Sequence, residues 1–87
     1  MNYCRTETVI DFDLRDDKGR AIGCIASTAF QPAWGVWLAN CIQTRDGKPY
    51  GSSRPSTRHA TEAAAKAKAA AKAAGCRKRA REQWGKV

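Results

Sequence analysis

Few residues of this 87-residue chain have the types and spacing that catalysis requires. Asp11 and Asp13 lie two positions apart in an alternating segment, and paired carboxylates can bind Mg²⁺ or transfer protons. A strand that presents such a pair to solvent is the more common situation. His59 is the only histidine, and the serines near it belong to a loop rather than to a nucleophile motif. No Gly-rich nucleotide-binding motif is present, so we expect no enzyme and no small-molecule substrate.

Four cysteines could form two disulfides in a secreted protein. Residues 1–7 contain no apolar signal segment, and we therefore expect a reducing bacterial cytoplasm with all four thiols free. The sequence contains no Cys-x-x-Cys pair and one histidine, so we expect no structural zinc site. No cofactor is expected.

Charge is distributed unevenly along the chain. Sixteen Lys and Arg residues against eight Asp and Glu residues give a net charge of +8 at pH 7. Residues 1–46 hold five basic and six acidic side chains, whereas residues 47–87 hold eleven basic and two acidic ones. A cationic half of this kind favours a nucleic acid, an anionic membrane surface or an acidic protein as the partner. No run of apolar residues is long enough to cross a membrane.

Hydrophobic alternation predicts three strands in the first half of the chain. The first spans about residues 8–14, the second 21–30 and the third 34–44, with turns at 15–20 and at Asp46-Gly47. Residues 50–56 are predicted to be an irregular loop. The large apolar side chains of one face are expected to form the core, namely Ile10, Phe12, Leu14, Ile22, Phe30, Val36, Leu38 and Ile42.

An Ala-rich segment over residues 57–74 predicts a helix, because Ala has the highest helix propensity and no Gly or Pro interrupts it. Ser56 or Thr57 would cap its start, and Gly75 would end it. A helical wheel predicts that its contact with the sheet is a stripe of Ala60, Ala63, Ala64, Ala67, Ala71 and Ala74. The predicted fold class is α+β: a three-stranded antiparallel sheet packed on one C-terminal helix (β-β-β-α). Residues 1–75 would form the single domain and residues 76–87 a basic extension.

The basic half supplies candidate binding residues. Free N–H groups at a helix start favour anions, and a neutralised phosphate releases counterions, so clusters near the loop, the helix and the extension indicate binding to a phosphate backbone. Tyr50, Trp37 and Trp84 could offer faces for base stacking, although Trp34 and Trp37 are more simply explained as core. The candidate site comprises Lys48, Tyr50, Arg54, Arg58, Lys66, Arg77, Lys78, Arg79 and Arg81.

Residues 46–74 resemble the C-terminal half of a double-stranded RNA-binding domain. The likeness rests on Asp46-Gly47-Lys48-Pro49-Tyr50-Gly51, a Ser/Arg loop, and Ser56-Thr57-Arg58-His59-Ala60-Thr61 leading into alanines. In that family, lysines at the helix start bind phosphates and read shape rather than sequence. The resemblance assigns those positions to Thr57, Arg58 and Thr61, of which only Arg58 is basic. The arm-type DNA-binding domains of tyrosine recombinases are similar in their three strands and one helix.

In size and layout the chain is also similar to small phage proteins that block host defence, such as anti-CRISPR proteins. Two functions therefore remain open. The first is a non-enzymatic protein of bacterial or phage type that engages nucleic acid or a nucleoprotein complex through its basic loop, helix and extension. The alternative is an inhibitor that acts by direct protein–protein contact.

Overall fold

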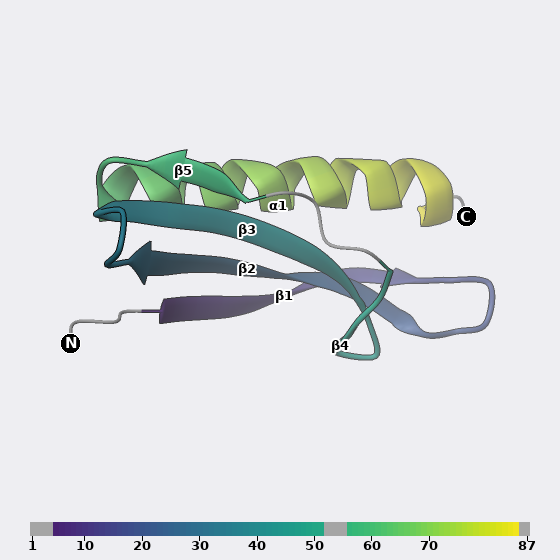
Figure 1. The fold of residues 1–87 in the computed structure, drawn as a ribbon. Coiled ribbons are helices and arrows are strands. Elements are labelled where there is room, and N and C mark those ends of the chain that lie inside the picture. Colours follow the sequence, from purple (N-terminus) through teal and green to yellow (C-terminus); the bar gives the residue numbers. More distant parts are fainter. Residues whose placement is uncertain (1–4, 52–55, 86–87) are drawn as a thin grey trace.

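A computed structural model describes residues 5–51 and 56–85 of the chain. It has two layers, an antiparallel sheet and one long helix that crosses it (Figure 1). The predicted α+β class and the antiparallel β1–β2–β3 core of the sheet are confirmed. The elements are β1 (Arg5–Arg15), β2 (Ala21–Gln31), β3 (Val36–Arg45), β4 (Lys48–Pro49), β5 (Thr57–His59) and α1 (Glu62–Trp84).

The β1–β2 and β3–β4 hairpins lie where the sequence predicts turns. Gly19, in the β1–β2 turn, has a φ of 78°, a value that residues with a Cβ rarely adopt. Asp46 and Gly47 both have positive φ, 53° and 78°, as a tight two-residue hairpin requires. Strand β1 also contains a bulge between Asp11 and Leu14, which shifts its register against β2.

The predicted helix start is wrong because residues 57–59 form strand β5 instead. β5 pairs antiparallel with β3, with Arg58 opposite Leu38. The helix begins after Thr61, whose hydroxyl accepts a hydrogen bond from the backbone N–H of Ala64 at 3.1 Å. Thr61 therefore serves as the N-cap, and neither Ser56 nor Thr57 does.

The predicted helix end is also wrong. Gly75 lies within α1, which continues through residues 76–84 and ends at Gly85. Glycine lowers helix stability but does not stop a helix when the flanking residues favour it and pack on a sheet. The segment predicted as a basic extension is thus, as far as Trp84, the C-terminal part of the same helix.

The helix packs on β2 and β3 through a different stripe from the one predicted. Its buried alanines recur every four residues and then continue beyond Gly75, at Ala65, Ala69, Ala73 and Ala80. All six predicted stripe members, Ala60, Ala63, Ala64, Ala67, Ala71 and Ala74, are exposed. The prediction failed because alanine occupies nearly every helical position, so composition does not mark one face.

In β3, the strand face that packs against the helix is not the predicted one. Ala39 is fully buried and Trp37 and Cys41 pack against the core, whereas Val36, Leu38 and Ile42 alternate to the other side. In β1 and β2 the predicted Phe12 and Ile22 are buried. The buried hydrophobic core consists of Phe12, Ile22, Cys24, Ala26, Ala39, Ala65, Ala69, Ala73 and Ala80.

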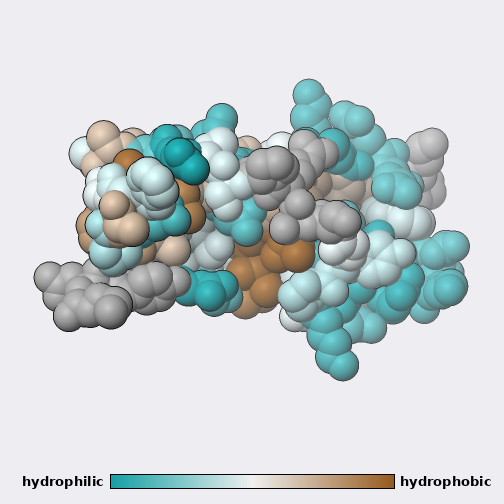
Figure 2. All heavy atoms as spheres, viewed as in Figure 1, coloured by the Kyte–Doolittle hydropathy of each residue, from teal (hydrophilic) through white to brown (hydrophobic). Residues whose placement is uncertain are grey.

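No described element covers the opposite face of the sheet. Val9, Ile25 and Ile42 lie directly across from one another on β1, β2 and β3, and Val9 is 67 % exposed. Figure 2 shows hydrophobic atoms near the middle of the molecule and hydrophilic atoms at the end that holds β4 and the β1–β2 turn. Trp34, in the β2–β3 turn, is 66 % exposed and so does not fill the core. No helix within residues 5–51 and 56–85 is both long and apolar enough to cross a membrane.

Candidate functional site

A groove of about 790 Å³ runs between the middle and C-terminal part of α1 and the segments β3, Tyr50-Gly51 and Thr57. We call it the basic groove. The described residues that line it are Cys41, Ile42, Gln43, Tyr50, Gly51, Thr57, Lys68, Ala71, Lys72, Gly75, Cys76, Arg79, Ala80 and Gln83.

Three cations from one helix give the groove its charge. Lys68, Lys72 and Arg79 lie four and then seven residues apart, a spacing that places them along one flank of α1. None of the described residues that line the groove is acidic. The groove therefore attracts anions along most of its length.

Lys72 also ties the helix to the sheet. Its Nζ donates a hydrogen bond to the backbone oxygen of Ala39 at 3.0 Å. Burial lowers the pKa of Lys72, and the charge of Lys68 lowers it further, while Cys41 opposes both effects. Lys68 and Lys72 thus repel each other, and an anion bound between them would relieve this repulsion.

Tyr50 lines the groove, and an arginine lies over its ring. The guanidinium of Arg45 lies 4.4 Å from the centre of the Tyr50 ring and 5.6 Å from that of Trp84. Arg20 approaches the same tyrosine at 5.5 Å. Tyr50 remains 47 % exposed, so part of its ring is accessible from the groove.

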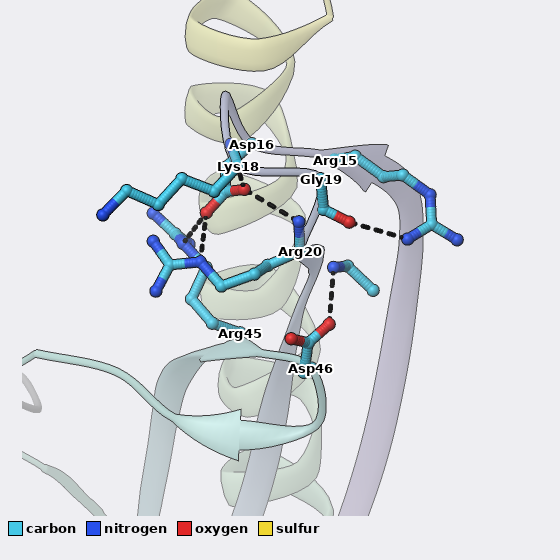
Figure 3. Close-up of polar contacts among 8 residues, drawn as sticks. Arg15, Asp16, Lys18, Gly19, Arg20, Arg45 and Asp46 are labelled. Atoms are coloured by element: carbon cyan, nitrogen blue, oxygen red, sulfur yellow. Dashed lines mark hydrogen bonds and ion pairs between the residues drawn. The ribbon is translucent and has the colours of Figure 1, made fainter.

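A single carboxylate anchors both arginines (Figure 3). Asp16 Oδ2 lies 2.7 Å from Arg20 Nε and 3.3 Å from Arg45 Nε, and its side chain is 1 % exposed. Asp16 Oδ1 accepts hydrogen bonds from the backbone N–H groups of Lys18 and Arg20. We call Asp16, Arg20, Arg45, Tyr50 and Trp84 the Asp16 cluster.

Burial alone would raise the pKa of Asp16. Hydrogen bonds from the backbone and side chain of Arg20 and from the backbone of Lys18 outweigh that effect and hold the pKa below its ordinary value of 3.8. The carboxylate therefore stays charged at neutral pH and shares its charge between two arginines. Arg45 Nη1 and Trp84 Nε1 are buried without a hydrogen-bond partner in the described part of the chain.

The predicted binding residues do not form one cluster. Tyr50 and Arg79 line the basic groove. Arg77 and Arg81 lie toward the other flank of α1, and Lys78 points away from the sheet, as the helical period requires. The remaining predicted residues lie elsewhere: Lys48 in β4, Arg58 in β5, Lys66 near the start of α1, and Arg54 outside the described residues.

Lys66 is also partly neutralised. Its Nζ lies 2.9 Å from Glu62 Oε1, an i,i+4 ion pair in which both side chains are about half exposed. It lies only two residues from Lys68 but on the other flank of the helix. The two lysines therefore differ in surroundings although both belong to α1.

The remaining candidates for catalysis have structural explanations. Asp11 Oδ1 accepts a hydrogen bond from the backbone N–H of Asp13 at 2.8 Å, within the β1 bulge. Asp13 has a φ of 56°, so the two residues do not share the regular strand face that alternation predicts. His59 Nε2 is hydrogen-bonded to Thr57 Oγ1 at 2.8 Å. No group of three or more His, Cys, Asp or Glu side chains in residues 5–51 and 56–85 could hold a metal ion.

Sequence reasoning missed Lys68, Lys72 and Arg45 as site residues. The spacing of Lys68, Lys72 and Arg79 would have revealed a common flank had the helix been extended through Gly75. Arg45 had no such signal, because only the fold brings β3, the β1–β2 turn and the end of α1 together. Comparisons of the chain with protein-family models, with curated proteins and with solved structures found no match.

Proposed function

We propose that this protein binds nucleic acid, alone or within a nucleoprotein complex, through the phosphate backbone. The observation that carries the proposal is the basic groove, in which Lys68, Lys72 and Arg79 line one wall and no described acidic residue faces them. Fixed cations at helical spacing suit a polyanion with regularly repeated charges. Binding would be non-enzymatic.

Two further features support this function. The exposed part of the Tyr50 ring offers a stacking surface beside the groove, and Arg45 lies over the ring. Arg77, Lys78 and Arg81 are exposed along the rest of α1 and extend the positive field beyond the groove. Contacts of this type position a backbone without reading bases, so we expect little sequence preference.

The test is fluorescence anisotropy with labelled duplexes and single strands of random sequence, at several salt concentrations. Lys68→Gln should lower the slope of log K against log salt by about 0.9 for duplex DNA or about 0.7 for a single strand. Lys66→Gln is the matched control, because it removes the same charge from the same helix but from a residue already paired with Glu62. Equal effects of the two variants, or no binding at about 50 mM salt, would contradict the proposal.

A second candidate is a protein-directed inhibitor, which the uncovered apolar face favours. Val9, Ile25 and Ile42 form a continuous apolar row on that face. Apolar surfaces of this kind commonly mark protein contacts. Such an inhibitor would form a stoichiometric complex whose affinity changes little with salt, and Lys68→Gln would leave it intact.

A further inference from the structure

Three cysteines from three elements meet beneath the basic groove. Cys24 of β2 is fully buried, Cys41 of β3 and Cys76 of α1 are partly buried, and none of the three forms a disulfide. Cys24 and Cys41 lie diagonally across the β2–β3 pair on the same face of the sheet, and interactions with Cys24 and Cys76 both lower the pKa of Cys41. Cys41 and Cys76 also line the groove. The cluster therefore has one inner thiol and two thiols that a small molecule in the groove can reach.

We propose that Cys41 is a nucleophilic thiol that reacts with small anionic disulfides entering the basic groove, and that Cys76 resolves the product. The inference does not depend on nucleic-acid binding. It rests on the cluster of thiols, on their position in an open groove, and on the cations beside them. A tripeptide disulfide with several carboxylates, such as glutathione disulfide, has the required charge and chemistry.

The charged and titratable groups that face Cys41 favour its thiolate. These groups are Cys24 from β2 and Lys72, Cys76 and Arg79 from α1. The hydrogen bond with Cys24 lowers the pKa of Cys41 most, burial opposes it, and Arg79, Cys76 and Lys72 lower it further, to about 7. A thiol whose pKa lies near the ambient pH combines a large thiolate fraction with good nucleophilicity.

Cys24 has the complementary role of hydrogen-bond donor. Its interaction with Cys41 and its burial both raise its pKa well above the ordinary value of 9.0, so it keeps its proton. Because it is fully buried, it cannot reach a molecule in the groove. Cys24 is therefore a positioning residue, which stabilises the Cys41 thiolate without touching the reagent.

The reaction is two successive thiol–disulfide exchanges. The Cys41 thiolate attacks one sulfur of the small disulfide; a new S–S bond forms, the old S–S bond breaks, and one small thiolate leaves. The Cys76 thiol then loses its proton to solvent and its sulfur attacks Cys41 Sγ. This second exchange forms a Cys41–Cys76 disulfide and releases the second small thiolate. The protein loses two electrons in total, and the small disulfide gains them.

The cationic wall selects the charge of the reagent. Lys68, Lys72 and Arg79 raise the local concentration of anions, so an anionic disulfide should react faster than a cationic one of similar size. Added salt should reduce this preference, because it screens exposed charges. A thiol on a neutral surface would show neither effect.

The first experiment measures which thiol reacts and at what pH. A Cys4→Ser background removes the one cysteine that lies outside the described residues. The rate of labelling with iodoacetamide is followed by mass spectrometry across pH 5–10, with peptide mapping of the labelled site. We expect Cys41 to react first with a midpoint near 7, whereas a midpoint near 9, or faster labelling after unfolding at pH 7, would overturn the proposal.

Variants at Cys24 and Cys76 test the two supporting roles. Cys24→Ala should raise the midpoint toward 9.0, and Cys24→Ser, which retains an O–H donor, should restore part of the shift. With glutathione disulfide, the background protein should lose two hydrogens in mass, whereas Cys76→Ser should accumulate the mixed disulfide. If Cys41→Ser reacts as fast as the background protein, Cys41 is not the nucleophile and the proposal fails.

Charge selectivity provides an independent test on folded protein. Glutathione disulfide is compared with cystamine, a small dicationic disulfide, at low and high salt. Lys68→Gln should reduce the preference for the anionic reagent severalfold, and Lys66→Gln, which removes a charge already paired with Glu62 on the other flank of α1, should not. Equal rates for the two reagents at low salt would show that the groove does not select the substrate and would contradict the proposal.

Discussion

The two faces of the β1–β2–β3 sheet are built from the same strands but hold side chains of different size. In its middle, the face under α1 carries small residues such as Cys24, Ala26 and Ala39. The opposite face carries the larger Val9, Ile25 and Ile42, and no described element covers it. The small residues let the helix approach the middle of the face under α1 closely, and larger core residues such as Ile10, Phe12 and Trp37 pack around them.

The composition of α1 requires this close approach. A helix whose buried stripe is alanine has no long side chains to fill a gap, so it is stable only against a sheet surface that lets its backbone come near. The hydrogen bond from Lys72 to the backbone oxygen of Ala39 crosses from helix to sheet and requires the same proximity. Larger side chains, Phe12 and Ile22, are buried where the Asp16 cluster fastens the end of the helix.

The largest expected effect on stability comes from breaking the ion pairs of Asp16. Asp16→Asn removes the charge that holds Arg20 and Arg45 while leaving both arginines in place. An arginine left buried without its carboxylate is strongly destabilising, so we expect the melting temperature to fall by about 15 °C or more. Circular dichroism during a thermal scan measures this change, and Asp17→Asn, in the same turn but exposed, serves as the control.

The same carboxylate predicts how stability depends on acid. The folded pKa of Asp16 lies below 3.8, so its charge stabilises the fold above that pH, and the stabilisation is lost as the pH falls from 3.8 through the folded pKa. Asp16→Asn should therefore lose less stability than the parent protein over this range. An identical acid profile for both proteins would mean that the ion pairs of Asp16 contribute nothing to folding.

An intermediate effect on stability is expected from enlarging a side chain in the contact between helix and sheet. Ala69 is 5 % exposed in the middle of the contact, so Ala69→Leu should overpack the interface and cost about 1–3 kcal/mol. Ala67→Leu is the matched control, since residue 67 is exposed in the same helix and leucine is a good helix former. Urea titration gives both values. Similar free energies of unfolding for the two variants would mean that the buried stripe does not dock the helix.

Hydrophobic alternation was sufficient to predict the three long strands but not β4 or β5, and alanine content was sufficient to predict a helix. Turn chemistry located the β1–β2 and β3–β4 hairpins, because Gly19 and Asp46-Gly47 provide the positive φ values that they need. Alternation could not tell which face of β3 meets the helix, since Val36, Leu38 and Ile42 look more like core than Trp37, Ala39 and Cys41. That decision depends on the fit between two surfaces, which no local pattern encodes.

The candidate site was less predictable than the fold for a related reason. Arg79 and Tyr50 were recognised from charge and aromatic character, but Lys68 and Lys72, which line the same groove, were not predicted as site residues. The thiol cluster is the clearest example, because Cys24, Cys41 and Cys76 are far apart in sequence and carry no spacing motif. Only sheet register and helix docking bring them together.

The smallest expected effect concerns the glycine that misled the prediction of the helix end. Gly75→Ala should stabilise the protein by about 0.5–1 kcal/mol, because alanine restricts the unfolded chain and favours the helix. A Cβ at this position would lie 3.4 Å from Arg79 Nη1, an ordinary contact with a flexible side chain. Gly23→Ala makes the same change on β2, where the new Cβ would collide with the backbone oxygen of Ile10, and it should destabilise instead. Opposite signs in parallel urea titrations are therefore expected. Loss of stability in Gly75→Ala would mean that the helix does not continue through this residue in solution, and the common flank of Lys68, Lys72 and Arg79 would be lost with it.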